Sequence, residues 1–190
     1  MKHRHFILHK PFGYISQFKY NNIGKKRLLG ELGEFPPETM AIGRLDEKSE
    51  GLLLLTTDGK MSEEVRSKKY EKEYYALVDG IPNKEQIKQL EHGVNIGIEG
   101  QKYLTRPSRV RAVEPPKTFP PMRQKIRDER HGPSSWLSII IREGKYRQVR
   151  KMTAAVGLPT LRLVRVRIGA IELNDLPAGQ SIEIPDFSAL

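Results

Sequence analysis

The chain has 190 residues, a formal net charge of +10 and no cysteine. A chain of this length can bury a substantial core as one domain or as two closely joined halves. The absence of cysteine excludes disulfides, thiolate nucleophiles, iron–sulfur clusters and cysteine-based zinc sites. No stretch approaches the roughly 18 consecutive apolar residues of a membrane span, and the N-terminus lacks the apolar region of a signal peptide. We therefore expect a cytoplasmic protein with no membrane partner.

Positive charge is concentrated in two segments of the chain. Residues 101–134 carry nine Lys or Arg and three Asp or Glu, and residues 142–167 carry eight and one. Such clusters are typical of proteins that bind a polyanion, because each phosphate contact releases condensed counterions. We therefore expect a nucleic acid partner, since a generally basic surface would spread its charge more evenly.

The pattern of apolar residues predicts strands interrupted by single helices. Short apolar runs bounded by turn residues predict strands at 4–10, 52–55, 73–78, 108–113, 136–141 and 161–168. Helical spacing and cap residues predict helices at 26–32, 61–67, about 83–92 and 147–156. The third of these helices should begin at Asn83 and end at Gly93. The fourth should bury Val149, Met152 and Val156 on one face.

Residues 114–135 differ from the rest of the chain. They contain five prolines and five Lys or Arg, and they show no hydrophobic periodicity. Long segments without periodicity inside a compact domain are usually functional or disordered. We expect a basic, extended arm that contacts RNA.

One stretch, GRLDEKSEGLLLLTTDG at residues 43–59, places Asp46 on a loop directly before a buried strand. Catalytic groups are often held at the edge of such rigid elements. If Arg44–Asp46 is extended, the side chains of Arg44 and Asp46 point the same way. A turn with a surface ion pair is the alternative, and the residues alone leave both interpretations open.

The same stretch resembles the catalytic motif of the pseudouridine synthases that modify ribosomal RNA, G-R-L-D-x-x-S-x-G-L-L-L-L-T-x-D-G. HKPFGYIS, residues 9–16, resembles the family's N-K-P-x-G motif, with His9 where asparagine is usual. KEYYALVDG, residues 72–80, resembles its K-x-Y-x-V strand. EGKYRQVRKMTAAVGLPTLRLVRVRIG, residues 143–169, resembles its C-terminal G-x-x-R-Q-I/V-R-R-M helix and the following L-R-L-x-R-x-x-I-G segment. The resemblance covers nearly the whole chain and is strongest to the large-subunit ribosomal RNA pseudouridine synthase E branch.

The resemblance implies an α+β fold, the pseudouridine synthase fold. We expect a mixed, mostly antiparallel sheet in two halves, with flanking helices and a central cleft. Residues 1–190 should form a single catalytic domain, without the S4 RNA-binding module that many members carry before the N-terminal motif.

The implied reaction is the isomerisation of uridine to pseudouridine in large-subunit (23S) ribosomal RNA, which needs a carboxylate but neither metal nor cofactor. By resemblance, Asp46 is that carboxylate, Tyr74 packs on the flipped base, and Arg150 pairs with the aspartate. Arg44 and Arg147 are rivals for that pairing. The expected RNA phosphate contacts are Arg44, Lys72, Lys145, Arg147, Lys151 and Arg165.

Other functions stay open from the sequence. They are a non-enzymatic RNA-binding ribosome assembly factor, a synthase acting on small-subunit ribosomal RNA or tRNA, and a glycosidase-like hydrolase. The hydrolase is disfavoured because no second positioned carboxylate is evident. A metal site at His3, His5 and His9 is disfavoured because no carboxylate supports it nearby. We expect a monomer. The sequence does not fix the target nucleotide or the atom that Asp46 attacks. It also does not decide between naked RNA and an assembling particle as the substrate.

Overall fold

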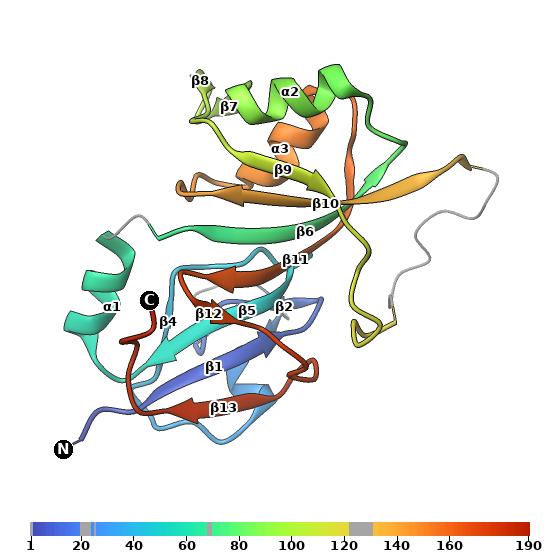
Figure 1. Ribbon diagram of the computed structural model, residues 1–190. Coiled ribbons are helices and arrows are strands. Elements are labelled where there is room, and N and C mark those ends of the chain that lie inside the picture. Colours follow the sequence, from blue (N-terminus) through green and yellow to red (C-terminus); the bar gives the residue numbers. More distant parts are fainter. Residues whose placement is uncertain (1, 20–23, 25, 68–69, 122–130) are drawn as a thin grey trace. The chain divides into compact units, whose positions relative to one another are not determined.

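The computed structural model describes residues 2–19, 24, 26–67, 70–121 and 131–190 (Figure 1). The chain divides into two compact units. The first unit comprises Met1–Tyr70 and Arg165–Leu190, and the second comprises Glu71–Val164. Each unit combines antiparallel strands with at least one helix, which confirms the predicted α+β class. The shared sheet and central cleft expected for the two halves stay predictions.

The first unit is built around strand β5 (Glu50–Thr56), whose seven residues are all buried. β1 (His5–Lys10) pairs antiparallel with β5, and β13 (Ser181–Ile184) pairs antiparallel with β1. β4 (Met40–Ile42) also pairs with β5. Because both faces of β5 are covered, its sequence is a continuous apolar run and does not alternate. The strand predicted at residues 52–55 is confirmed.

Shorter elements complete the first unit. Helix α1 (Gly59–Ser67) follows β5 and contacts β4. β11 (Thr160–Ile168) begins in the second unit and ends in the first, where its last residues pair with β12 (Ile171–Glu172). The prediction of a helix at 26–32 is only partly right. Its first residues form β3 (Arg27–Leu28), which pairs in parallel with β2 (Tyr14–Ile15), and the helical part is one 3-10 turn, η1 (Leu29–Leu32).

The core of the first unit lies between β1, β5 and the segment around η1. Its buried side chains are Phe6, Leu8, Leu29, Leu53 and Leu55. Phe35 packs edge-on against Phe6, with ring centroids 5.5 Å apart. This apolar layer fixes β5 against β1, so the loop that precedes β5 begins from a rigid support.

The second unit contains the antiparallel ladder β6–β10–β9, formed by β6 (Lys72–Asp79), β10 (Ser134–Ile141) and β9 (Arg109–Ala112). Helix α2 (Lys84–His92) contacts β9, and helix α3 (Gln148–Ala155) contacts β7. β7 (Asn95–Ile98) and β8 (Gln101–Leu104) form a hairpin. None of the helices in the described part of the chain is long and apolar enough to cross a membrane.

The predicted cap of α2 is confirmed. The Asn83 side chain accepts a hydrogen bond from the Gln86 backbone N–H at 2.8 Å, and the Gln86 side chain accepts one from the Asn83 N–H at 3.0 Å. Gly93 ends the helix. On α3, the predicted apolar face is also confirmed, because Val149, Met152 and Val156 are buried.

The Pro-rich arm is described only in part. Residues 113–121 contain no helix or strand, as expected, and residues 122–130 lie outside the described residues. The last two residues of the expected arm, Ser134 and Ser135, belong to β10.

Gly51 is required by the packing of β5. Its φ is +107°, and a Cβ at this position would lie 2.2 Å from the backbone oxygen of Arg165. Gly51→Ala should therefore lower the free energy of unfolding by at least about 2–3 kcal/mol. Urea unfolding followed by circular dichroism measures this change. Gly59→Ala is the matched control, because nothing lies within 4 Å of its Cβ position; equal stability of the two variants would contradict the prediction.

Candidate active site

Asp46 lies half-buried on the loop between β4 and β5, and the backbone beside it is fixed by hydrogen bonds. The Ser16 hydroxyl donates to the Leu45 carbonyl at 2.8 Å and accepts from the Leu45 N–H at 2.9 Å. On the other side, the Ser49 N–H donates to the Asp46 carbonyl at 2.9 Å. Hydrogen bonds on both sides of Asp46 thus fix the backbone that carries its carboxylate.

Lys10 is a fully buried cation in the same unit. Its ammonium donates to the carbonyl of Pro11 at 3.0 Å and to that of Tyr14 at 2.6 Å. Burial lowers the pKa of Lys10 to about 7 even though the nearby carboxylates of Glu50 and Asp46 act to raise it. Lys10 therefore belongs to the charged surroundings of Asp46.

Arg165 is buried as well, with 3% of its surface exposed. Its Nε donates to the Leu52 carbonyl at 2.8 Å, and its Nη2 is buried with no hydrogen-bond partner among the described residues. This burial argues against the RNA phosphate contact predicted for Arg165. The sequence shows a cation at this position but not that β5 covers it, so the prediction placed it on the surface.

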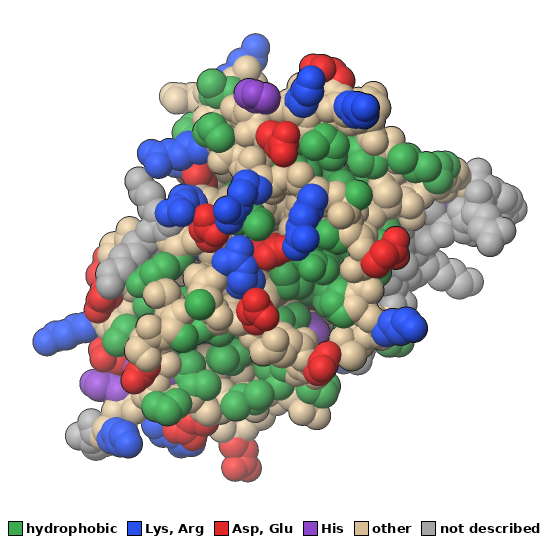
Figure 2. All heavy atoms as spheres, viewed as in Figure 1, with side chains coloured by type: hydrophobic (Ala, Val, Ile, Leu, Met, Phe, Trp, Pro, Cys, Tyr) green, Lys and Arg blue, Asp and Glu red, His purple; other side chains and the backbone are tan. Residues whose placement is uncertain are grey.

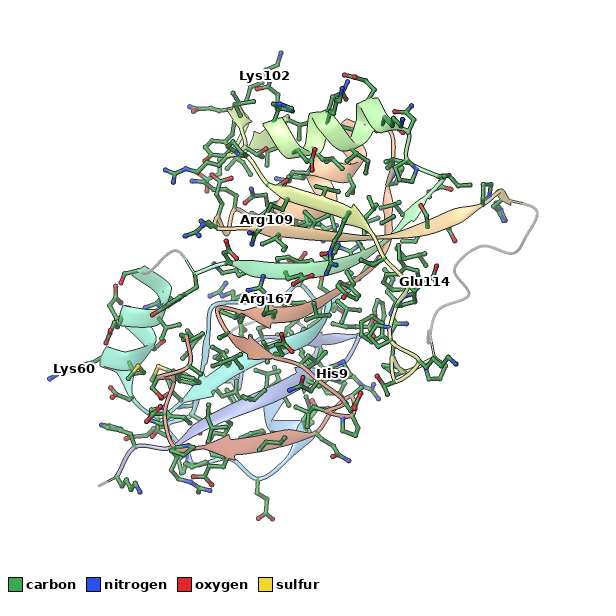
Figure 3. The ribbon with its side chains drawn as sticks, viewed as in Figure 1. His9, Lys60, Lys102, Arg109, Glu114 and Arg167 are labelled. Atoms are coloured by element: carbon green, nitrogen blue, oxygen red, sulfur yellow. The ribbon has the colours of Figure 1, made fainter. Side chains whose placement is uncertain are left out.

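His9, labelled in Figure 3, occupies the position where the motif that residues 9–16 resemble has asparagine. Its Nδ1 lies 2.7 Å from the Leu176 carbonyl, which can only accept, so Nδ1 carries the hydrogen and donates it. His5 instead contacts the Thr56 hydroxyl at 3.0 Å and the ring of Phe187. In the described part of the chain, no group of three or more metal-ligating side chains occurs.

Tyr74 and Tyr75 of β6 lie on opposite faces of their strand, because side chains alternate along a strand. Tyr74 is buried, with 8% of its surface exposed. Tyr75 packs against Phe119, with ring centroids 6.0 Å apart, and Phe119 also packs against Trp136. The second face thus anchors the start of the Pro-rich arm, whereas Tyr74 is the more buried of the two rings, and its predicted contact with a flipped base stays a prediction.

Arg150 lies half-buried on α3, and its Nη1 donates to the Thr160 carbonyl at 3.2 Å. Arg147 directly precedes the helix with a left-handed backbone, at φ +52°. Asp46 belongs to the first unit and Arg150 to the second, so the predicted pairing of Asp46 with Arg150 stays a prediction.

The other predicted RNA contacts differ in exposure. Arg44 and Lys145 are exposed, whereas Lys72, Arg147 and Lys151 are half-buried. The Lys151 ammonium donates to the Gly97 carbonyl at 2.6 Å, which ties α3 to the β7–β8 hairpin.

Some of the positive charge in residues 101–167 is neutralised within the second unit. Arg109 and Arg142 pair with Glu71 at 2.7 Å and 3.0 Å, and Arg111 pairs with Glu73 at 3.4 Å. The face shown in Figure 2 accordingly carries Lys and Arg side chains interspersed with Asp and Glu. The net positive charge counted from the sequence of this segment is therefore larger than the net charge that its surface presents to RNA.

Residues 4–155 match the sequence model of a family described as RNA pseudouridylate synthase. The chain belongs to this family. It is 45% identical over 176 residues to the ribosomal large subunit pseudouridine synthase E of Xanthomonas campestris, covering 92% of this chain and 91% of that protein. It is 38% identical over 185 residues to the protein of the same name from Vibrio parahaemolyticus, covering 94% of this chain and 72% of that protein.

A solved structure described as a crystal structure of pseudouridylate synthase has the same fold as this synthase. The TM-score is 0.75, with 24% identity, over 96% of this chain and 70% of that chain. The implied pseudouridine synthase fold is thereby confirmed.

The buried position of Lys10 predicts how stability depends on pH. Its pKa of about 7 in the folded protein lies below the ordinary value of 10.5, so between these values the unfolded chain binds more protons. The free energy of unfolding should therefore rise with pH from about 7 to about 10, by at most about 1.4 kcal/mol per pH unit. Urea unfolding of the wild type and Lys10→Met at pH 6.5 to 9.5 measures this slope. Parallel curves for the two proteins would contradict the prediction.

Proposed function

We propose that this RNA pseudouridylate synthase isomerises a uridine of large-subunit ribosomal RNA to pseudouridine. The observation that carries the proposal is the 45% identity, over nine-tenths of both chains, to a protein named for that activity. The Asp46 loop adds to it, because its backbone is fixed on both sides while its carboxylate is only half-buried. A small-subunit or tRNA substrate has no such support among the relatives named above.

The reaction rearranges bonds within one nucleotide. The N1–C1′ bond breaks, the base turns, and a C5–C1′ bond forms; C5 loses a proton and N1 gains one. No other reactant is consumed, so the enzyme needs to supply only a carboxylate and proton transfer. In our proposal Asp46 is the carboxylate that acts at the sugar or at the base during cleavage.

Two residues of the second unit complete the proposed site. The target base has to leave its stack, at a cost of a few kcal/mol, before it can react. Tyr74 offers an aromatic ring for the flipped base, and its phenol can relay the proton that leaves C5. Arg150 orients the Asp46 carboxylate through a charge-assisted hydrogen bond.

The basic residues supply the rest of the binding. Arg44, Lys72, Lys145, Arg147 and Lys151 are proposed to contact phosphates and so to set the register of the RNA without reading its sequence. The enzyme is proposed to act as a monomer in the cytoplasm, on free RNA or on an assembling particle.

Asp46→Asn tests the proposed reaction. Large-subunit RNA and subunit precursors are incubated with each protein, and pseudouridine is mapped by carbodiimide-dependent primer extension. The wild type should give one new stop, and Asp46→Asn should lower the rate at least about a thousandfold. Asp175→Asn, an exposed carboxylate in the same unit, should react as the wild type does. Tight RNA binding by the wild type without any stop would instead support the assembly-factor alternative.

Tyr74→Phe separates the two roles proposed for this tyrosine. The variant keeps the ring and loses only the hydroxyl, so RNA affinity should stay within about twofold of the wild type. The single-turnover rate should fall about a hundredfold if the phenol relays the proton. An unchanged rate would remove the phenol from the mechanism and leave the ring as a stacking surface.

A further inference from the structure

The loop between β10 and α3 carries an exposed tyrosine that the reaction does not use. Tyr146 has 70% of its surface exposed, the largest exposed fraction among the large hydrophobic side chains in the described part of the chain. Lys151 lies over its ring, with the ammonium 5.1 Å from the ring centroid. One face of the ring therefore carries a cation, while the high exposure leaves the rest of the ring open to solvent.

The loop that presents Tyr146 is held in place by the carboxylate of Glu143. This side chain is 7% exposed and accepts hydrogen bonds from the Tyr103 hydroxyl, the Arg106 N–H at 3.0 Å and the Gln148 side chain at 2.7 Å. Burial alone acts to raise the pKa of Glu143, but these donors outweigh it, so the pKa lies below its usual range. The carboxylate is therefore charged at neutral pH, and the loop has a fixed base.

Further hydrogen bonds close the loop on itself. The Lys145 N–H donates to the Gln148 side chain at 3.0 Å, and the Gln148 N–H donates to the Lys145 carbonyl at 3.1 Å. Arg147 lies between them in a left-handed conformation, which is unfavourable for a residue with a side chain. A strained conformation that surrounding bonds maintain is a common feature of binding loops.

A second tyrosine ring of the same unit also carries a cation. The Lys145 ammonium lies over the ring of Tyr103, 4.8 Å from its centroid. Arg106 and Lys102 are exposed on the adjoining hairpin and its exit, and Lys102 extends from β8 into solvent (Figure 3). The surface formed by Lys102, Tyr103, Arg106, Lys145, Tyr146 and Lys151 is here called the Tyr146 platform. It combines an aromatic ring with positive charge, and it lies entirely within the second unit.

We propose that the Tyr146 platform binds an unpaired nucleotide of the substrate RNA, with its base stacked on Tyr146 and its phosphates near Lys145 and Arg106. The proposal rests on the proposed function for the identity of the RNA. Aromatic rings bind unpaired bases without regard to sequence, because every base has a stacking face, and neighbouring cations bind the backbone. A protein partner is less suited to the platform: Arg106 pairs with Glu143 at 3.8 Å, but the platform still carries four cations against this one carboxylate, and an excess of positive charge favours a polyanion. An exposed tyrosine without function would not need a buried carboxylate to fix its loop.

The experiment measures RNA affinity in the Asp46→Asn background, so that its outcome does not depend on catalysis. The probes are a fluorescent single-stranded 12-nucleotide RNA and a 12-base-pair RNA duplex. Tyr146→Ala should weaken single-strand binding about tenfold and duplex binding less than twofold, and Tyr146→Phe should restore single-strand binding. Lys145→Ala should weaken the binding of both probes. It should also lower the salt dependence of the affinity by about the amount expected for one phosphate contact.

Ile81→Ala is the matched control, because Ile81 is 69% exposed in the same unit and lies outside the platform. It should bind both probes as the parent does. Equal binding by Tyr146→Ala and its parent, or an equal loss on the single strand and the duplex, would overturn the stacking proposal. These binding measurements require no turnover, so they test the stacking proposal separately from the reaction. If the wild type forms no pseudouridine, that result overturns the proposed function alone.

Discussion

The backbone of β5 lies against Arg165 so closely that residue 51 has no space for a side chain, and this contact fixes the strand start at which the candidate catalytic loop ends. Gly51 is also the Cα partner of Lys10 in the β1–β5 ladder. Lys10 and Arg165 are both buried, and both lie beside the start of β5. The loop that carries Asp46 ends at this point. The apolar core beneath β5 keeps this arrangement rigid, so the loop does not have to be ordered by substrate.

Burial disfavours the charged form of Lys10, and the carboxylates near β5 offset this effect only in part, because its pKa is still lowered to about 7. Glu50 has the largest stabilising effect on the charged form of Lys10, followed by Asp46, whereas Arg165 opposes it. In a region of low dielectric such charges interact strongly, and removing one of them leaves the others uncompensated. The first unit therefore places Asp46 among several charges, so a change of charge at one position alters the energy of the rest.

The sequence predicted those helices and strands that are specified by residues within or directly beside them. The four leucines of β5, the Asn83 cap and the apolar face of α3 each specify an element within a few residues. β13 was missed because its four residues are exposed or half-buried and its pairing depends on β1, at the other end of the chain. The hairpin β7–β8 was missed because its glycines suggested only a turn. Of the candidate site, the motif predicts Asp46, Tyr74 and Arg150, whose roles stay predictions, and the burial of Arg165 depends on packing that no local pattern encodes.

The energy of base flipping indicates why the second unit carries more than one aromatic contact. Unstacking a nucleotide costs a few kcal/mol, and the carboxylate chemistry of the first unit does nothing to offset it before the base arrives. Stacking of one base on an aromatic ring contributes about 1–3 kcal/mol. A single ring for the target base would compensate the cost only in part. In our proposals Tyr74 stacks the flipped base and Tyr146 stacks an unpaired base of the same RNA, so the two rings together would offset more of the cost of opening the RNA than one ring does.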